Sequence, residues 1–258
     1  MKLYKQYFIM HLKGQMQYKT SFVLSTIAQF LVPFSSFIGI HFLFMRFENI
    51  GGFTREEVML TFAVMHLAFA FGEFAGRGFD YFPLLLGNGG FDRALVRPRN
   101  VVFQILISQM HFHRIGRLTQ ALVVFIYALP RTGIVWTWDN VLTLSLMIVF
   151  GSVLFFSLFV LYAAFTFFTV EGLEFMNVFT DGGREHGTYP FSIYGDGILR
   201  FLTFVVPLAL VQYYPLLYIT GRTDRVFNMF TPVLAALFLL PCYLFFRFGM
   251  RRYKSVGS

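Results

Sequence analysis

The sequence predicts an all-α membrane protein that crosses the bilayer several times. Of its 258 residues, 57% are hydrophobic and 13% are charged, and the mean hydropathy is +0.64. A soluble core of this size could not bury so much apolar surface, so lipid must solvate part of the chain. Uncharged stretches long enough to cross a bilayer as a helix, about 20 residues, recur along the chain.

Six transmembrane helices are predicted within a single domain, residues 1–258. They are residues 21–44, 58–74, 101–130, 141–170, 201–220 and 227–246. The third contains Arg114 and Arg117, and we expect one long helix whose first part lies near the membrane surface and whose arginines snorkel toward the headgroups. The fourth carries no charge and follows Trp136 and Trp138, whose indole rings favour the headgroup level.

The last two stretches each contain two prolines, and proline cannot continue the backbone hydrogen bonding of a helix. Broken or re-entrant helices are therefore expected there rather than straight rods. The prolines are Pro207, Pro215, Pro232 and Pro241.

Residues 1–20 are predicted to form an amphipathic helix on the membrane surface. Tyr4, Phe8, His11 and Leu12 recur at helical spacing, while lysines occupy other positions. The segment lacks the short basic patch and apolar core of a cleavable signal peptide. The alternative interpretation is a frayed polar tail.

The distribution of basic residues predicts that both termini lie in the cytoplasm. With six spans, most of the 21 lysines and arginines fall in inner connections, including Arg184 and Arg200, as the positive-inside rule requires. The basic residues left outside are Arg46, Arg55, Arg131, Arg222 and Arg225.

Composition and motifs exclude several functions. The net charge of +8 is explained by inner loops beside anionic headgroups rather than by nucleic acid. A single cysteine, Cys242, excludes an internal disulfide and a cysteine-based metal site. A P-loop needs a glycine directly before its lysine, and no lysine here follows a glycine. No cofactor is therefore expected in this chain, and any ATP-driven motor must be another subunit.

Histidines in the apolar stretches are weak candidates for sites. His111 and His113 would point to nearly opposite faces of a helix, so a shared metal is not expected. For His41 and His66 we favour a satisfied hydrogen bond between helices over a place on a transport pathway.

Two features lie near the end of the second span. Glu73 is expected at a helix end. Gly72 and Gly76 have the GxxxG spacing of helix-packing sites, although this short pattern also recurs by chance.

The connection between the second and third spans is the strongest indication of function. Residues 84–100 carry Asp92, Arg93, Arg97 and Arg99 in an otherwise hydrocarbon-compatible chain. Such a cluster suits contact with a soluble partner, and we expect that partner to be an ATPase. The alternative is an ordinary positive-inside loop beside the headgroups.

Two motifs resemble those of ABC-2-type permeases, a family of bacterial transporter subunits. The first is the loop GNGGFDRALVRP, residues 87–98. Its triplet Asn-Gly-Gly, residues 88–90, is looser than the single glycine that the family usually has before the acidic position. The second comprises LRFLTFVVP, residues 199–207, and YYP, residues 213–215. The resemblance covers nearly the whole chain.

The resemblance implies a permease subunit that pairs with itself or a relative, surrounded by the lipids of a bacterial inner membrane. Two ATPase subunits beneath would bind ATP and Mg²⁺. In such permeases the connection between spans two and three holds a coupling helix that docks on the ATPase, here within residues 79–96. The apolar anchors would be Tyr81, Phe82, Leu84 and Leu85. The polar rim would be Asp92, Arg93, Arg97, Pro98 and Arg99.

The resemblance also implies a short fifth span followed by a re-entrant element on the outer side, within residues 201–226. Pro207 would loosen the helix, and Tyr213, Tyr214 and Pro215 would mark the reversal of the chain. The alternative is a single kinked span.

The expected mechanism is alternating access in a dimer, in which ATP binding closes the ATPases and the coupling helices move the spans. Export of a lipophilic or amphipathic compound is expected, because no charged residue is predicted in the middle of a span. The competing function is a membrane-embedded enzyme acting on lipid, with Glu73, His66 or the pair Glu171 and Glu174 as acid and base. A passive scaffold is a third possibility.

Overall fold

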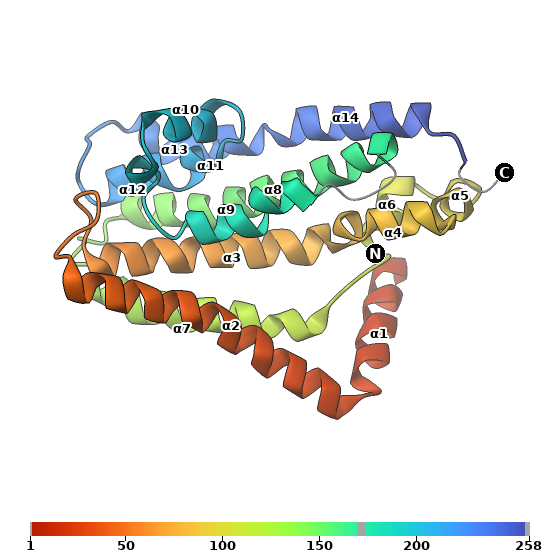
Figure 1. Cartoon of the computed structure of the whole chain (residues 1–258), viewed down its shortest axis with the longest axis horizontal. Helices are drawn as coiled ribbons and strands as arrows, with labels where there is room; N and C mark the ends of the chain where they lie inside the picture. The colour runs from red at the N-terminus through yellow and green to blue at the C-terminus, as the bar shows by residue number, and fades with distance from the viewer. Residues whose placement is uncertain (1, 170–173, 256–258) are drawn as a thin grey trace.

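The computed structural model describes residues 2–169 and 174–255, and these residues form a bundle of helices without a β-strand. Figure 1 shows the connection between the second and third predicted spans at one end of the bundle, with the C-terminus beside it. We call this the inner end, because the charge distribution predicts it to lie in the cytoplasm. The opposite end, which holds residues 47–54, is called the outer end.

Helix α1 (Lys2–Met16) confirms the predicted N-terminal helix. Tyr4 is exposed rather than packed, whereas His11 and Gln15 hydrogen-bond the backbone of residues 107–112. The half-buried side chains share one helical face: Leu3, Tyr7, Phe8, His11, Leu12 and Gln15. The helix is therefore docked on the protein, and its place at a membrane surface stays a prediction.

Helices α2 (Lys19–Arg46) and α3 (Arg55–Asp80) agree with the first two predicted spans. Most of α3 is buried and α2 is mostly exposed, because α3 packs against both α7 and α8. A capping box starts α3: the Thr54 side chain accepts a hydrogen bond from the Glu57 amide, and the Glu57 side chain accepts one from the Thr54 amide. The central helix of the bundle is thus α3.

The predicted single helix over residues 101–130 is wrong. The chain forms α6 (Val101–Leu106), a non-helical stretch, a 3-10 turn (Phe112–Arg114) and α7 (Ile115–Ala128). The helix can stop here because residues 107–112 find hydrogen-bond partners in the side chains of α1. At about 1.5 Å per residue, α7 is about 21 Å long, shorter than the hydrocarbon core. It packs along both α2 and α3.

Helix α8 (Trp138–Thr169) agrees with the fourth span, whose last predicted residue, 170, lies outside the described residues. Helices α13 (Phe227–Ala236) and α14 (Leu239–Arg252) together make the last span. They are separated near residue 237. Pro241 lacks the amide hydrogen that would continue the α-helical bonding, so the carbonyl of Leu237 accepts from the Leu240 amide instead, at 3.0 Å. The expectation of a broken last span is confirmed.

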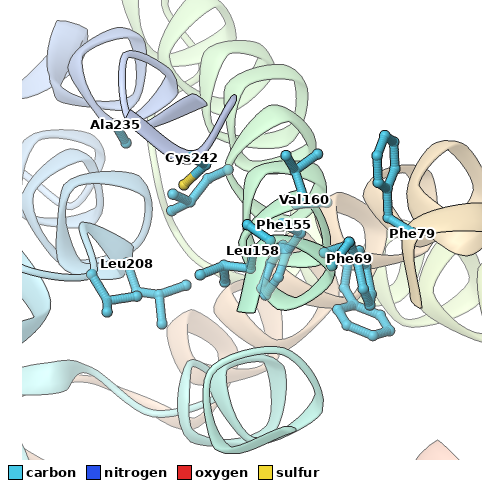
Figure 2. Close-up of a cluster of buried hydrophobic side chains, with 14 of the residues drawn as sticks. Phe69, Phe79, Phe155, Leu158, Val160, Leu208, Ala235 and Cys242 are labelled. Carbon is cyan, nitrogen blue, oxygen red and sulfur yellow. The ribbon is translucent and has the colours of Figure 1, made fainter. Parts of the chain in front are cut away.

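The main hydrophobic core lies between α3, α8 and the C-terminal helices (Figure 2). Phe69 of α3 packs edge-to-face on Phe155 of α8, with ring centroids 5.2 Å apart. Phe79 packs in the same way on Phe246 of α14, at 5.5 Å. Cys242 is buried in this core, consistent with a structural role for its thiol.

Gly72 and Gly76 set the distance between α3 and α8. A Cβ atom on Gly72 would lie 2.7 Å from the carbonyl oxygen of Ser152, and one on Gly76 would lie 2.7 Å from the ring of Phe159. Only glycine lets the two helices approach this closely. The helix-packing interpretation of the GxxxG pattern is therefore confirmed.

The chain between residues 174 and 194 returns toward the outer end along α3 (Figure 1). Its elements are the 3-10 helix η3 (Glu174–Val178), α9 (Asp181–His186) and the 3-10 helix η4 (Phe191–Tyr194). Gly187 packs on Met65 in the middle of α3, and Ile193 reaches Gly51 at the outer end. The predicted inner loop containing Arg184 is therefore wrong.

The predicted fifth span, residues 201–220, is bent. A limb formed by α10 meets a limb formed by α11 and α12 at 85°. The bent pair starts and finishes at the outer end of the bundle. Ile193, just before the pair, contacts Gly51 there, and Arg222, just after it, pairs with Glu57 at 2.8 Å. The three elements are α10 (Asp196–Phe204), α11 (Leu208–Val211) and α12 (Tyr213–Ile219).

The total of six spans stays a prediction. Among the described residues, four helices are long and apolar enough to cross a membrane, or five if the bent pair is one span. Helix α7 is shorter than this, and segment 174–194 is broken into short helices, although both run along the central helix.

Replacing Gly72 by alanine is expected to destabilise the bundle by about 1–3 kcal/mol, because the added methyl overpacks the contact between α3 and α8. Thermal unfolding in detergent measures this. The control is Gly39→Ala on α2, where nothing lies within 4 Å of the new Cβ atom. Its higher helix propensity should leave stability unchanged or raise it by up to about 1 kcal/mol. Equal effects of the two substitutions would contradict the close approach.

Candidate functional site

A short helical hairpin, α4 (Phe82–Gly87) and α5 (Gly90–Leu95), forms the inner end. Gly89 turns the chain between them with a φ of +66°, a left-handed backbone that favours glycine. Phe82 and Phe91 are fully buried with ring centroids 5.2 Å apart, and Phe82 also packs on Phe167 of α8. The predicted coupling element is thus two helices fixed rigidly to the core.

Some of the predicted anchors do not reach the surface. Phe82 belongs to the core and cannot be an exposed anchor in this conformation, so that prediction is corrected. Tyr81 and Leu85 are half-buried, and the Arg77 guanidinium lies 4.6 Å from the Tyr81 ring centroid. The exposed apolar side chains are Leu84, Leu95 and Val96, at 65%, 43% and 83%.

The predicted polar rim also divides into two parts. Asp92 accepts a hydrogen bond of 2.8 Å from the Ser255 hydroxyl, which ties the C-terminal segment to the hairpin. Arg93, Arg97 and Arg99 are exposed and border a hollow of about 510 Å³ beside α1 and α6, with Pro98 exposed between them. We call five exposed residues the tip surface: Leu84, Arg93, Leu95, Val96 and Arg97.

A second group of charged side chains lies inside the bundle around Glu73. Glu73 is 2% exposed, and its carboxylate meets three guanidinium groups. Arg117 of α7 lies 3.3 Å from it, Arg77 lies 3.5 Å from it one turn along α3, and Arg114 is in direct contact. A buried carboxylate without a partner is strongly destabilising, so these contacts hold α3, α7 and the turn before α7 together.

Arg117 extends this group to two more elements. Its guanidinium donates a hydrogen bond of 2.9 Å to Gln29 of α2 and lies 3.8 Å from the Asp181 carboxylate of α9. Asp181 also pairs with Arg184 at 3.2 Å. The Arg184 guanidinium is buried against α3, 4.7 Å from the ring centroid of Phe69.

Glu185 and His66 continue the group toward the outer end. Glu185 accepts hydrogen bonds from Arg184 at 2.6 Å and from the Ser36 hydroxyl at 2.9 Å. His66 is fully buried, and its Nδ1 bonds the Phe62 carbonyl. Its Nε2 has no hydrogen-bond partner among the described residues and lies 3.9 Å from Glu185. We call the following residues the buried charge network: His66, Glu73, Arg77, Arg114, Arg117, Asp181, Arg184 and Glu185.

A model of the ABC-2 family transporter protein matches residues 30–257, a range that includes the tip surface and the buried charge network. The chain belongs to the ABC-2 transporter family. No curated protein and no solved structure matches the chain. The family and the apolar helices together identify a multi-pass membrane subunit of an ABC transporter, and they confirm the resemblance seen in residues 87–98 and 199–215.

Several expectations about the polar residues of this ABC-2 permease are wrong. Glu73 lies inside α3 rather than at its end, and Arg117 is buried on it rather than snorkelling to the headgroups. His66 bonds its own helix instead of a neighbouring one. Glu73 and Arg117 find charged partners inside the bundle and need not reach water, and His66 is bonded through one of its two ring nitrogens.

The sequence carried a signal for part of this network. Glu73 and Arg77 stand four residues apart on one helix, and Arg114 and Arg117 stand three apart at the start of the next. An acidic residue on one span and two arginines on the neighbouring span predict a contact between those spans. Nothing local predicts the contribution of Asp181, because residues 174–194 carry four charged residues and do not have the apolar pattern of a span.

His111 and His113 do not lie on a regular helix, so the expectation of opposite faces is wrong. Their ring centroids are 5.3 Å apart. Burial lowers the pKa of His111 to about 4, aided by the charge of nearby Arg77, so the His111 ring is neutral at pH 7. In the described part of the chain no three histidine, cysteine or acidic residues could hold a metal ion together.

The predicted gating residues lie around the bend between α10 and α11. Pro207 stands at the bend, as expected for a residue that loosens the helix. Tyr213 and Tyr214 are half-buried, and Pro215 is buried in the first turn of α12, where a missing amide hydrogen is tolerated. The reversal therefore falls at Pro207 rather than at residues 213–215. The Tyr214 hydroxyl lies 3.3 Å from that of Thr203 and joins the two limbs.

Replacing Glu73 by glutamine is expected to lower the apparent Tm in detergent by roughly 10 °C, which corresponds to about 3–5 kcal/mol for breaking a buried ion pair. Three guanidinium groups would lose the carboxylate that they share. The control is Glu56→Gln, whose partner is the more exposed Arg55. That change should cost at most about 1 kcal/mol. Equal Tm values for the two variants would show that Glu73 does not hold the helices together.

Proposed function

We propose that this chain is the permease subunit of an ABC exporter whose tip surface docks on a separate ATPase. The chain works as one of two permease subunits, the second identical or paralogous, above two ATPase subunits that bind ATP and Mg²⁺. ATP-driven closure of the ATPases moves the two hairpins, and the permease subunits alternate between inward-open and outward-open states.

The observation that carries this proposal is the composition of the tip surface. Leu84, Leu95 and Val96 are exposed at the inner end, although a soluble surface rarely presents such a cluster without a partner. Arg93 and Arg97 flank them as a charged rim. An apolar centre with a charged rim is the usual composition of a docking surface between proteins. The buried Phe82 and Phe91 make the hairpin rigid enough to transmit a push into α8.

We infer six crossings, with both termini in the cytoplasm of a bacterial cell. The fifth crossing in this arrangement is segment 174–194, which runs along α3 and ends beside Gly51. The bent pair is then a re-entrant element that starts and ends on the outer side. Support comes from the contact of Arg222 with Glu57 just after the pair, and from Leu208, which reaches inward to Gly183.

The structure weakens the expectation that the cargo is lipophilic. That expectation rested on the lack of charge within the spans, whereas Glu73, Arg117, Arg184 and Glu185 lie beside the middle and inner parts of α3. Export remains the proposed direction, on the family resemblance.

A membrane-embedded lipid enzyme is not favoured. Two of its proposed acids and bases have structural partners: Glu73 is shared by three arginines, and His66 bonds its own helix. Glu174 is exposed, and Glu171 lies outside the described residues. A passive scaffold would not need a tip surface.

Co-purification with an ABC ATPase from the same organism tests the proposal. The variant Arg93→Ala/Val96→Asp should weaken the complex by about 2 kcal/mol, roughly thirtyfold in Kd, because it removes the centre and the rim of the tip surface. Detergent-solubilised complexes would be measured by affinity and by permease-stimulated ATP hydrolysis.

The matched control for this test is Arg225→Ala, an exposed arginine at the outer end. It should leave both affinity and ATP hydrolysis unchanged. Asp92→Asn separates the C-terminal contact from docking, since Asp92 bonds Ser255. If the tip variant binds and stimulates the ATPase as the wild type does, docking at the tip is wrong.

A further inference from the structure

Two carboxylates of the buried charge network reach the molecular surface partway along the bundle. The Asp181 and Glu185 side chains are 51% and 38% exposed, whereas that of Arg184 between them is 7% exposed. Glu185 faces His66 of α3. At 1.5 Å per residue, His66 lies about 18 Å from Thr54, where α3 is capped, and about 21 Å from Asp80, where α3 ends. Glu185 is therefore near the middle of the central helix.

Helix α2 borders the same surface. The Ser36 hydroxyl, well inside α2, donates to Glu185 at 2.9 Å. Behind Glu185 lies the fully buried His66 ring. Its Nε2 atom faces Glu185 and, in the part of the chain that the structure describes, has no hydrogen-bond partner. We call Ser36, Asp181 and Glu185 the acidic strip. Figure 1 shows α9, which carries both acids, beside the middle of α3.

Hydrocarbon is a poor cover for the acidic strip. An ionised carboxylate facing lipid near the bilayer centre costs several kcal/mol, on the order of 3 or more, and such groups face water or protein instead. Among the described residues, the arginines paired with these acids are Arg117 and Arg184, and both are buried while the carboxylates are partly exposed.

A dry contact with a second copy of the chain is also unfavourable. If the strip lay on the two-fold axis of a dimer, Asp181 and Glu185 would face the same two carboxylates of the second copy. Like charges in a dry interface repel each other. Water and a ligand that donates hydrogen bonds match the strip, because ionised carboxylates can only accept hydrogen bonds.

We propose that the acidic strip lines the aqueous path of the transporter and binds ammonium or hydroxyl groups of a hydrophilic cargo. This inference rests on the proposed function, because it assigns the path and the cargo class of that permease. The acids supply the acceptors, Ser36 orients Glu185 from α2, and His66 offers one more buried ring nitrogen behind it.

Thiol accessibility in membranes tests this proposal. In a Cys242→Ser background, Ser36→Cys places a near-isosteric thiol beside Glu185 without removing either acid. The probes are two membrane-impermeant methanethiosulfonates, one carrying a trimethylammonium group and one carrying a sulfonate group. The control is Ser35→Cys, the same substitution one residue earlier, which is exposed but points about 100° away around the helix.

The proposal expects Ser36→Cys to react and Ser35→Cys to resist, although Ser35 is the more exposed of the two. The ammonium reagent should modify Ser36→Cys at least about tenfold faster than the sulfonate reagent, because the acids attract it. Adding Glu185→Gln should bring the two rates together.

Two outcomes would overturn the inference. If Ser36→Cys is as unreactive as Ser35→Cys, the strip is dry and does not line a path. If it reacts but shows no preference between the reagents, the strip does not select for positive groups. All labelling rates are measured on the permease without nucleotide, so they are independent of ATPase docking. A failed co-purification would refute the proposed function while leaving the labelling pattern intact.

Discussion

The arrangement of the bundle depends on the carboxylate of Glu73. Three arginines from three parts of the chain converge on it, and the carboxylate itself is 2% exposed. Each buried guanidinium needs the carboxylate to offset its loss of hydration, and the carboxylate needs them for the same reason. This shared partner holds α7 against α3, while His11 and Gln15 of α1 stabilise the break in the chain before α7.

The consequences continue through Arg117 into the second half of the chain. Because Arg117 also faces Asp181, the short helix α9 is drawn against α3 instead of remaining with the inner loops. Arg184 then fills the space beside Phe69, and Glu185 meets α2 through Ser36. A segment too polar to be recognised as a span thus lies among the apolar helices, and its acids give a hydrophobic transporter subunit one hydrophilic surface.

Sequence reasoning predicted what local pattern determines. The apolar lengths of α2, α3 and α8, the glycine contact at Gly72 and the break at Pro207 follow from hydropathy, side-chain size and missing amide hydrogens. The tip was placed at the right hairpin, but Phe82 was taken for an anchor, because an aromatic residue in a polar loop can equally pack on its own core. Whether it does depends on Phe167 and Phe246, far along the chain.

The path of residues 174–194 could not be predicted, because its stability comes from charges distant in sequence rather than from its own hydropathy. The measurement that tests the account most directly is sided labelling of Ile193→Cys in intact cells, in a Cys242→Ser background, with a membrane-impermeant maleimide. If segment 174–194 crosses the membrane, Ile193→Cys is labelled from outside, as Arg131→Cys is. Labelling only after the cells are opened, as for Arg97→Cys, would place residue 193 at the inner end and contradict the crossing.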